Sequence, residues 1–192
     1  MKTALLASYE KDEALRRLGK LLIDNGWTLL GSAGTAKHLM DNSIPCRDVA
    51  SIVGPPILGH RVVTLAREVY AGLLSATPED AKELRHLGIA PIDLVYVTLY
   101  PLEATISDTT STPEDVIEKT DIGGPTLLRA AAKGRRLALS NPDQIDALES
   151  WIKNGSPESE REAFVTYLAA AAERRVADYV NASATYWESK TA

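Results

Sequence analysis

Short apolar runs alternate with amphipathic runs along the first part of the chain. Residues 3–8, TALLAS, are typical of a buried strand, and residues 11–26, KDEALRRLGKLLIDNG, have apolar positions at helical spacing and a closing glycine. Residues 27–32, WTLLGS, and residues 34–43, GTAKHLMDNS, repeat this pair of strand and helix. Residues 46–51, CRDVAS, predict a third short strand, which leads into a long loop rich in glycine and proline.

The second half of the chain continues the alternation. Residues 64–74 and 78–87 predict two helices, and the second begins at Thr77 with a proline and acidic residues in its first turn. Residues 92–101, IDLVYVTLYP, are nearly all apolar or β-branched, as expected of a strand that is covered on both faces. Residues 135–141, RRLALSN, predict a further strand, and helices follow it to the end of the chain.

Strands that alternate with helices imply a parallel sheet with right-handed crossovers, so the sequence predicts an α/β fold. The polar stretch NGSPESE, residues 154–160, is the clearest candidate linker in the chain. We therefore expect one domain over residues 1–153 and, over residues 154–192, a C-terminal helical extension that packs on the same domain.

Composition and charge exclude several classes of protein. The chain has 192 residues, of which 45% are hydrophobic and 24% charged, as expected of a globular domain. Its formal net charge of −5 gives no general attraction to nucleic acid or to acidic membranes. Cys46 is the single cysteine, which excludes an internal disulfide, and the three scattered histidines lack metal-ligand spacing. No apolar stretch reaches about 18 residues, so we expect a cytoplasmic protein without nucleic-acid, membrane or metal partners.

Ligands of a parallel α/β sheet bind beyond the carboxyl ends of its strands, so the loops there carry the candidate chemistry. SAGT, residues 32–35, lies between a strand and a helix, where hydroxyls and free backbone N–H groups suit a phosphate or, equally, an ordinary helix cap. Lys11 either adds a positive charge for the same phosphate or is an ordinary solvated lysine. Arg61 and Thr64 end the loop GPPILGHRVVT, from which an arginine can form paired hydrogen bonds to a phosphate.

The stretch TDIGGPTLLRAAAKG, residues 120–134, places an acidic residue and two glycines directly before a helical run that contains basic residues. Asp121 and Lys133 suit a reactive site. They also suit a helix cap at the N-terminus and a cation beside the C-terminal end of the helix dipole. The residues alone leave both interpretations open.

These motifs occur in the order of one known family. The chain resembles the N-terminal inosine monophosphate (IMP) cyclohydrolase domain of the bifunctional purine-biosynthesis enzyme, a member of the methylglyoxal-synthase-like fold group. The resemblance runs from ALLASYEK through SAGTAK, GHRVVTL and LVYVTLYP to DIGGPTLLRAAAKG. It implies a three-layer, mainly parallel sheet with additional C-terminal helices, no cofactor and a homodimer. The chain also stops about where the family's transformylase domain would begin, so we expect a free-standing homologue.

The resemblance implies a ring closure in which the carboxamide nitrogen of a formamido-imidazole ribotide attacks its own formyl carbon and water leaves. Such a site must hold two unreactive groups together, move a proton off nitrogen and stabilise an oxyanion. The positions that match the family's catalytic residues are Lys133, Asp121 and Tyr100. Those that match its phosphate-binding residues are Lys11, Ser32, Gly34, Thr35, Arg61 and Thr64. Those that match its base-contacting residues are Thr98, Ile122, Gly123, Gly124 and Val63.

Two of these catalytic matches carry further expectations. Lys133 is expected to return from the end of its helix to the pocket that holds Asp121. Tyr100 either joins them or packs as an ordinary residue at the end of a strand.

The third loop departs from the family pattern. The family's Arg-Val-Lys-Thr-Leu-His-Pro reads RVVTLAR here, so Val63, Ala66 and Arg67 replace a catalytic lysine, a histidine and a proline. Valine cannot donate a hydrogen bond, and the loss of one stabilising donor costs about a hundredfold or more in rate. Arg67 is a candidate substitute for the lost lysine. Thr98 also replaces an asparagine that contacts the base in the family.

Three functions remain open from the sequence. The first is IMP cyclohydrolase-like ring closure of a formamido-imidazole carboxamide ribotide. The second is a diverged cyclase that acts on a modified azole ribotide in nucleoside natural-product biosynthesis. The third is a non-catalytic nucleotide-sensing module. Asp121, Tyr100 and Lys133 together favour catalysis, whereas Val63 favours sensing.

Overall fold

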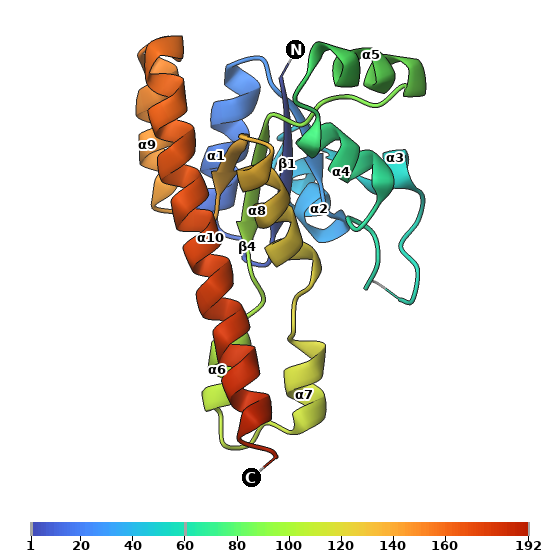
Figure 1. The fold of residues 1–192 in the computed structure, drawn as a ribbon, viewed down its shortest axis with the longest axis vertical. Coiled ribbons are helices and arrows are strands. Elements are labelled where there is room, and N and C mark those ends of the chain that lie inside the picture. The colour runs from blue at the N-terminus through green and yellow to red at the C-terminus, as the bar shows by residue number, and fades with distance from the viewer. Residues whose placement is uncertain (1, 60, 192) are drawn as a thin grey trace.

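A sheet of parallel strands lies at the centre of the computed structural model, which describes residues 2–59 and 61–191 (Figure 1). The strand order is β3-β2-β1-β4-β5, and each neighbouring pair is parallel. The strands are β1 (Thr3–Ser8), β2 (Thr28–Gly31), β3 (Arg47–Asp48), β4 (Leu94–Thr98) and β5 (Leu137–Leu139). The predicted α/β fold with a mainly parallel sheet is confirmed.

Helices cover both faces of the sheet. One face packs against α1 (Glu13–Asp24), α2 (Ala33–Asp41) and α9 (Gln144–Lys153), and the other against α4 (Arg67–Leu74) and α8 (Gly123–Lys133). Successive residues of a strand point to opposite faces, so Leu6 of β1 lies in the first hydrophobic core and Leu5 in the second. The two cores give the three layers that the resemblance implies.

Some boundaries differ from the sequence prediction. The third strand, predicted over residues 46–51, is limited to Arg47–Asp48. It ends there because the Asp48 carboxylate accepts a hydrogen bond from the backbone N–H of Ala50 at 2.8 Å and the chain turns into α3 (Ala50–Val53). The sequence analysis identified neither α3 nor the two short helices beyond the carboxyl edge of the sheet, α6 (Leu102–Ser107) and α7 (Pro113–Glu118).

The helix expected from Thr77 onward is present as α5 (Pro78–Leu87). The Thr77 side chain accepts a hydrogen bond from the backbone N–H of Asp80, and the Asp80 carboxylate accepts one from the backbone N–H of Thr77. This reciprocal pair is the capping box that fixes where a helix begins.

The C-terminal part of the chain is one long helix, α10 (Glu158–Glu188), of 31 residues. Its Val165 and Leu168 lie in the first core, and its Ala172 and Val176 lie in the second. At about 1.5 Å per residue the helix is about 46 Å long, well beyond the length of any strand. Figure 1 shows its last turns running past the carboxyl edge of the sheet, beside α6.

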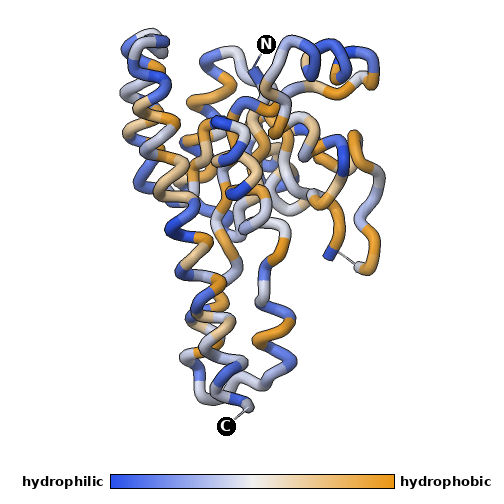
Figure 2. The backbone as a smooth tube through the Cα atoms, viewed as in Figure 1, coloured by the Kyte–Doolittle hydropathy of each residue, from blue (hydrophilic) through white to orange (hydrophobic). Residues whose placement is uncertain are grey.

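The loop after α3 projects from the body of the protein. It carries Ile57 and Leu58, which are 59% and 68% exposed, and Figure 2 shows it as a hydrophobic stretch away from the sheet. Across residues 2–59 and 61–191, no helix has the length and apolar composition needed to span a membrane.

Candidate functional site

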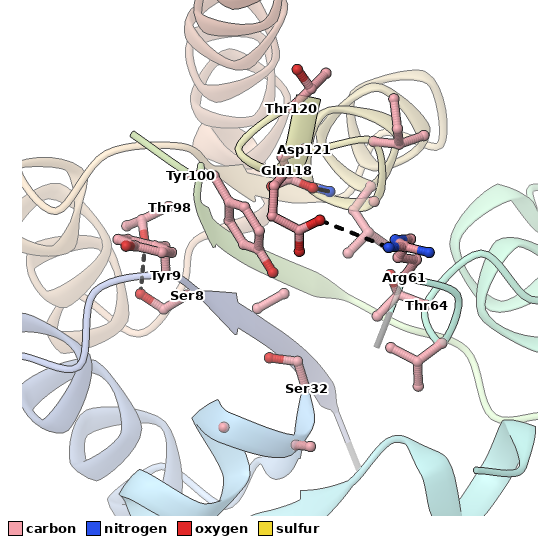
Figure 3. Close-up of a pocket in the computed structure, with 18 of the residues that line it drawn as sticks. Ser8, Tyr9, Ser32, Arg61, Thr64, Thr98, Tyr100, Glu118, Thr120 and Asp121 are labelled. Carbon is pink, nitrogen blue, oxygen red and sulfur yellow. Dashed lines mark hydrogen bonds and ion pairs between the residues drawn. The ribbon is translucent and has the colours of Figure 1, made fainter. Parts of the chain in front are cut away.

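A cavity of about 740 Å³ opens at the carboxyl edge of the sheet (Figure 3). Its walls are the ends of β1 and β4, the start of α2, the loop before α4, the segment from α7 to α8 and the end of α10. Segments distant in sequence meet here because parallel strands place their carboxyl ends at one edge. The sequence-predicted residues that line the cavity are Lys11, Ser32, Gly34, Arg61, Val63, Thr64, Thr98, Tyr100, Asp121, Ile122, Gly123 and Gly124.

The start of α2 forms one end of the cavity. Ser32 precedes the helix, and its hydroxyl donates to Thr35 Oγ1 at 3.0 Å rather than capping the backbone. The first backbone N–H groups of a helix lack partners within the helix and carry a partial positive charge. Because Ala33 and Gly34 line the cavity, this helix start suits an anion.

Lys11 adds a cation to the same end. Its Nζ lies 3.8 Å from the place where a Cβ of Gly34 would be, and it donates to the backbone carbonyls of Ser8 and Tyr9. Burial lowers the pKa of Lys11, and the neighbouring carboxylates Glu10 and Asp12 act in the opposite direction. A bound phosphate would further stabilise the charged ammonium.

Thr35 does not line the cavity, unlike the rest of its loop. Its side chain is fully buried, and its hydroxyl donates to the carbonyl of Ser8 at 3.2 Å and accepts from the backbone N–H of Ser8 at 3.1 Å. With the bond from Ser32, these contacts use its full hydrogen-bonding capacity. The Thr35 hydroxyl therefore joins β1 to α2 and has no hydrogen-bonding capacity left for a phosphate.

Ser8 and Thr98 join the ends of β1 and β4 at the cavity wall. Their hydroxyl oxygens lie 2.7 Å apart, and Ser8 also donates to the carbonyl of Glu10 at 2.7 Å. Thr98 Oγ1 accepts from the backbone N–H of Glu10 at 3.1 Å. Thr98 therefore supports the loop that carries Lys11, and one lone pair of its oxygen is left for a ligand.

Asp121 lies at the start of α8 with its carboxylate on the cavity wall. Its Oδ1 accepts from the backbone N–H of Gly124 at 2.9 Å. Burial raises the pKa of Asp121, and hydrogen bonds from the backbone of Gly124, Tyr100 and Gly123 partly offset the rise. A Cβ at Gly124 would lie 2.4 Å from Asp121 Oδ2, so this close approach requires glycine. Asp121 thus accepts a hydrogen bond from the first turn of α8 and also lines the cavity, which is compatible with both interpretations that the sequence left open.

Tyr100 projects into the cavity between Glu118 and Ser32 (Figure 3). Burial raises the pKa of its phenol, and the charges of Asp121 and Glu118 raise it further. The ring centroid of Tyr9 lies 5.1 Å from that of Tyr100 at an angle of 54°. Tyr100 is therefore a protonated donor at neutral pH that faces the cavity, rather than a packing residue at the end of a strand.

Arg61, Val63 and Thr64 form the wall beside the start of α8. Thr64 Oγ1 lies 3.0 Å from the place where a Cβ of Gly123 would be, and Arg61 Nη2 lies 3.9 Å from Glu118 Oε2. Val63 presents an apolar side chain to the cavity. Within the described part of the chain, no group of three or more His, Cys, Asp or Glu side chains could hold a metal ion.

Comparison with known proteins identifies the family. The family described as "MGS-like domain" matches residues 14–126, more than half of the chain. The chain belongs to the MGS-like domain family. A bifunctional purine biosynthesis protein PurH from Cyanothece sp. is 42% identical over 146 residues, which are 73% of this chain and 28% of that protein. PurH from Xanthomonas campestris is 37% identical over 190 residues, which are 97% of this chain and 36% of that protein.

The solved structures include a relative of similar extent. The crystal structure of ForH superposes on this MGS-like domain with a TM-score of 0.81 at 31% identity, and the match covers 97% of this chain and 98% of that one. By contrast, the chain spans only 28% and 36% of the two PurH proteins.

Two cationic residues predicted for the site of this MGS-like domain do not reach the cavity. Lys133 is the exposed last residue of α8, an 11-residue helix that begins beside Asp121. The length of this helix places Lys133 about 16 Å from that end along the helix axis. The helix runs back across the sheet, so Lys133 does not line the cavity beside Asp121 of the same chain. Arg67 does not line the cavity either: its side chain is 75% exposed, and its Nε lies 3.5 Å from Glu68 Oε1.

Three of the cavity residues that sequence reasoning missed come from α7 and α10. Ile117 and Glu118 come from α7, which has a sequence signal in the form of Thr112, Pro113 and an acidic residue at the third helical position. Trp187 comes from the far end of α10. No local pattern indicates that it approaches the cavity, because its position follows from the length and packing of the helix.

Proposed function

We propose that this chain closes the six-membered ring of a formamido-imidazole carboxamide ribotide, as an IMP cyclohydrolase does. The observation that carries the proposal is a single cavity that joins an anion site at the start of α2 to the partly buried carboxylate of Asp121 and the phenol of Tyr100. Similarity to bifunctional purine biosynthesis proteins supports the same class of substrate.

The proposed reaction forms one C–N bond and releases one water. The carboxamide nitrogen attacks the formyl carbon, and the former carbonyl oxygen becomes an oxyanion on a tetrahedral carbon. The C–O bond then breaks. The leaving water carries the formyl oxygen, one hydrogen from the carboxamide nitrogen and one from the formamide nitrogen. Since both reacting groups belong to one molecule, holding them in contact supplies much of the rate.

Asp121 and Tyr100 suit the two proton roles in this reaction. The raised pKa of Asp121 makes its carboxylate a stronger base than an ordinary aspartate. The raised pKa of Tyr100 keeps its phenol protonated, so that it can donate a hydrogen bond to the oxyanion. Lys11 and the start of α2 would hold the 5′-phosphate of the ribotide.

A modified azole ribotide is the second candidate substrate. Val63 favours it, because this apolar side chain lines the cavity where the resemblance implies a lysine. A base that carries its own hydrogen-bond donor, or one that closes more readily, would depend less on that lysine.

The decisive experiment incubates the purified protein with the formylated imidazole carboxamide ribotide and follows the purine chromophore against the spontaneous rate. We expect acceleration by wild-type protein and a much weaker calorimetric affinity for the nucleoside than for the nucleotide. Two or three lost charge-assisted hydrogen bonds, at about 1.5–3 kcal/mol each, separate those affinities by several decades. Equal affinities would overturn the phosphate site. Binding without turnover of this ribotide or of a modified azole ribotide would favour a sensing module.

A further inference from the structure

The end of α10 forms a wall of the cavity that the proposed chemistry does not use. Trp187 lines the cavity and is 38% exposed, and Ile117 of α7 lines it with 58% exposure. Apolar side chains that line a cavity offer surface that a bound ligand can remove from water. Both come from elements beyond the carboxyl edge of the sheet.

Specific contacts hold this part of α10 beside the cavity. Arg175 forms an ion pair with Glu103 of α6 at 2.5 Å. The hydroxyl of Tyr179, which is buried, donates to the carbonyl of Lys119 at 2.9 Å and accepts from the backbone N–H of Asp121 at 2.8 Å. The helix is thus joined to the segment that carries the proposed base.

The indole of Trp187 contacts a neighbouring ring and keeps open surface. Tyr186 contacts it in a T-shaped arrangement, with ring centroids 4.9 Å apart and an angle of 79° between the planes. Tyr186 itself packs against the second core. Such an edge-to-face pair fixes the orientation of a ring without covering all of it.

The two ends of the cavity differ in chemistry. The α2 end has backbone N–H groups and Lys11, which suit a phosphate. Elsewhere in the cavity, Ile117 of α7, Ile122 just before α8 and Trp187 of α10 add apolar surface. Ile122 adjoins Asp121, so this apolar surface reaches the place where the base of a ribotide would react.

We propose that Trp187 is a specificity-determining residue whose indole covers the heteroaromatic base of a ribotide 5′-monophosphate. The inference rests on the proposed function and extends it, because it assigns the recognition of the base to the C-terminal helix. A planar base and an indole both have large apolar faces, and stacking them removes both from water.

The test compares two ligands, inosine 5′-monophosphate and ribose 5-phosphate, which lacks the base. Calorimetry on the full chain is expected to show that Trp187→Ala weakens binding of inosine 5′-monophosphate about tenfold and leaves ribose 5-phosphate unchanged. Trp187→Phe is expected to retain most of the affinity. Tyr167→Ala is the matched control, since Tyr167 is a 54% exposed aromatic residue on the same helix that does not line the cavity.

Tryptophan fluorescence gives a second readout. Trp27 and Trp151 are only 6% and 7% exposed and lie in the first core, so Trp187 is expected to report binding. The emission change caused by inosine 5′-monophosphate should disappear in Trp187→Phe.

The outcomes distinguish this inference from the proposed function. Unchanged affinity of Trp187→Ala for the nucleotide, or an equal loss for both ligands, would overturn the role of Trp187 while the wild-type data still supported a ribotide site. Wild-type protein that binds ribose 5-phosphate but not the nucleotide would overturn both.

Discussion

Replacing Asp121 by asparagine separates proton transfer from helix capping. Asparagine retains a carbonyl oxygen that can accept from Gly124, but it turns one carboxylate oxygen into an N–H donor and cannot take up a proton. The native carboxylate accepts backbone hydrogen bonds from Gly124, Tyr100 and Gly123. The amide therefore leaves at least one of these three N–H groups without a good partner.

The structural cost of this change is lower than the expected catalytic cost. One partly buried donor left unsatisfied costs about 1–2 kcal/mol, which lowers the melting temperature by about 2–8 °C in a chain of this size. A total stability of about 5–15 kcal/mol keeps the variant folded at 25 °C. If Asp121 removes the proton, turnover falls by about a hundredfold or more, equivalent to about 2.7 kcal/mol of activation free energy.

The assay measures ring-closure rate and melting temperature on the same preparations. Asp80→Asn is the matched control, because Asp80 caps α5 through the same type of bond and lies outside the cavity; its turnover should equal that of wild type. A normal rate in Asp121→Asn together with a lowered melting temperature would show that Asp121 only caps α8. The pH dependence gives a second check. Because burial raises the pKa of Asp121, the acid limb of the rate profile should lie above pH 3.8, and Asp121→Asn should abolish it.

The raised pKa also has a consequence for stability. The folded state binds the Asp121 proton more tightly than the unfolded state, so this group favours folding below its unfolded pKa and that contribution is lost as pH rises through its folded pKa. Asp121→Asn should remove this part of the pH dependence of unfolding.

Three further substitutions test the site. Tyr179→Phe removes the hydroxyl that holds Lys119 and Asp121, so it should lower the free energy of unfolding by about 1–3 kcal/mol and reduce kcat more than it changes KM. Denaturant melts would measure the first effect and steady-state kinetics the second. An unchanged kcat would refute the coupling between Tyr179 and Asp121. Lys133→Ala should leave turnover within about threefold, because Lys133 lies at the far end of α8, and a hundredfold loss would mean that a second copy of the chain supplies it. Val63→Lys should accelerate closure of the ordinary imidazole ribotide in the same assay; no gain, with turnover of another azole ribotide, would favour the modified substrate.

The sequence predicted most of the fold because the relevant signals are local. The capping box at Thr77 is contained in four consecutive residues, and the apolar run of β4 predicts a buried strand without reference to any other part of the chain. The parallel topology then follows, and it brings the loops after β1, β2 and β4 to one edge. That is why most candidate residues meet in one cavity although no sequence pattern joins them directly.

The positions of Lys133, Thr35 and Trp187 relative to the cavity have tertiary causes. The distance between Lys133 and Asp121 follows from an uninterrupted helix between them, which the resemblance did not take into account. Thr35 has a suitable hydroxyl at a suitable position, but its bonds to Ser8 are visible only once β1 and α2 are packed together. Trp187 reaches the cavity because α10 continues beyond the sheet.

The charges in the cavity limit how the proposed reaction can work. Among the described residues that line it, the charged side chains are Lys11 at the α2 end and Arg61, Glu118 and Asp121 toward α7 and α8. With valine at position 63, the second group contains two carboxylates and one guanidinium. An oxyanion that forms there beside an ionised Asp121 would be repelled.

Proton transfer removes this conflict. When Asp121 takes the proton from the attacking nitrogen, its negative charge disappears as the oxyanion appears, and the positive end of the α8 dipole can stabilise the new charge. Base catalysis and oxyanion stabilisation are then a single coupled event, for which a lysine at position 63 is helpful but not required. The same reasoning fixes the sign of a pH effect in Val63→Lys. A nearby ammonium favours the ionised carboxylate, so it should lower the pKa of Asp121 and move the acid limb of the rate profile to lower pH, even if the maximal rate rises only slightly.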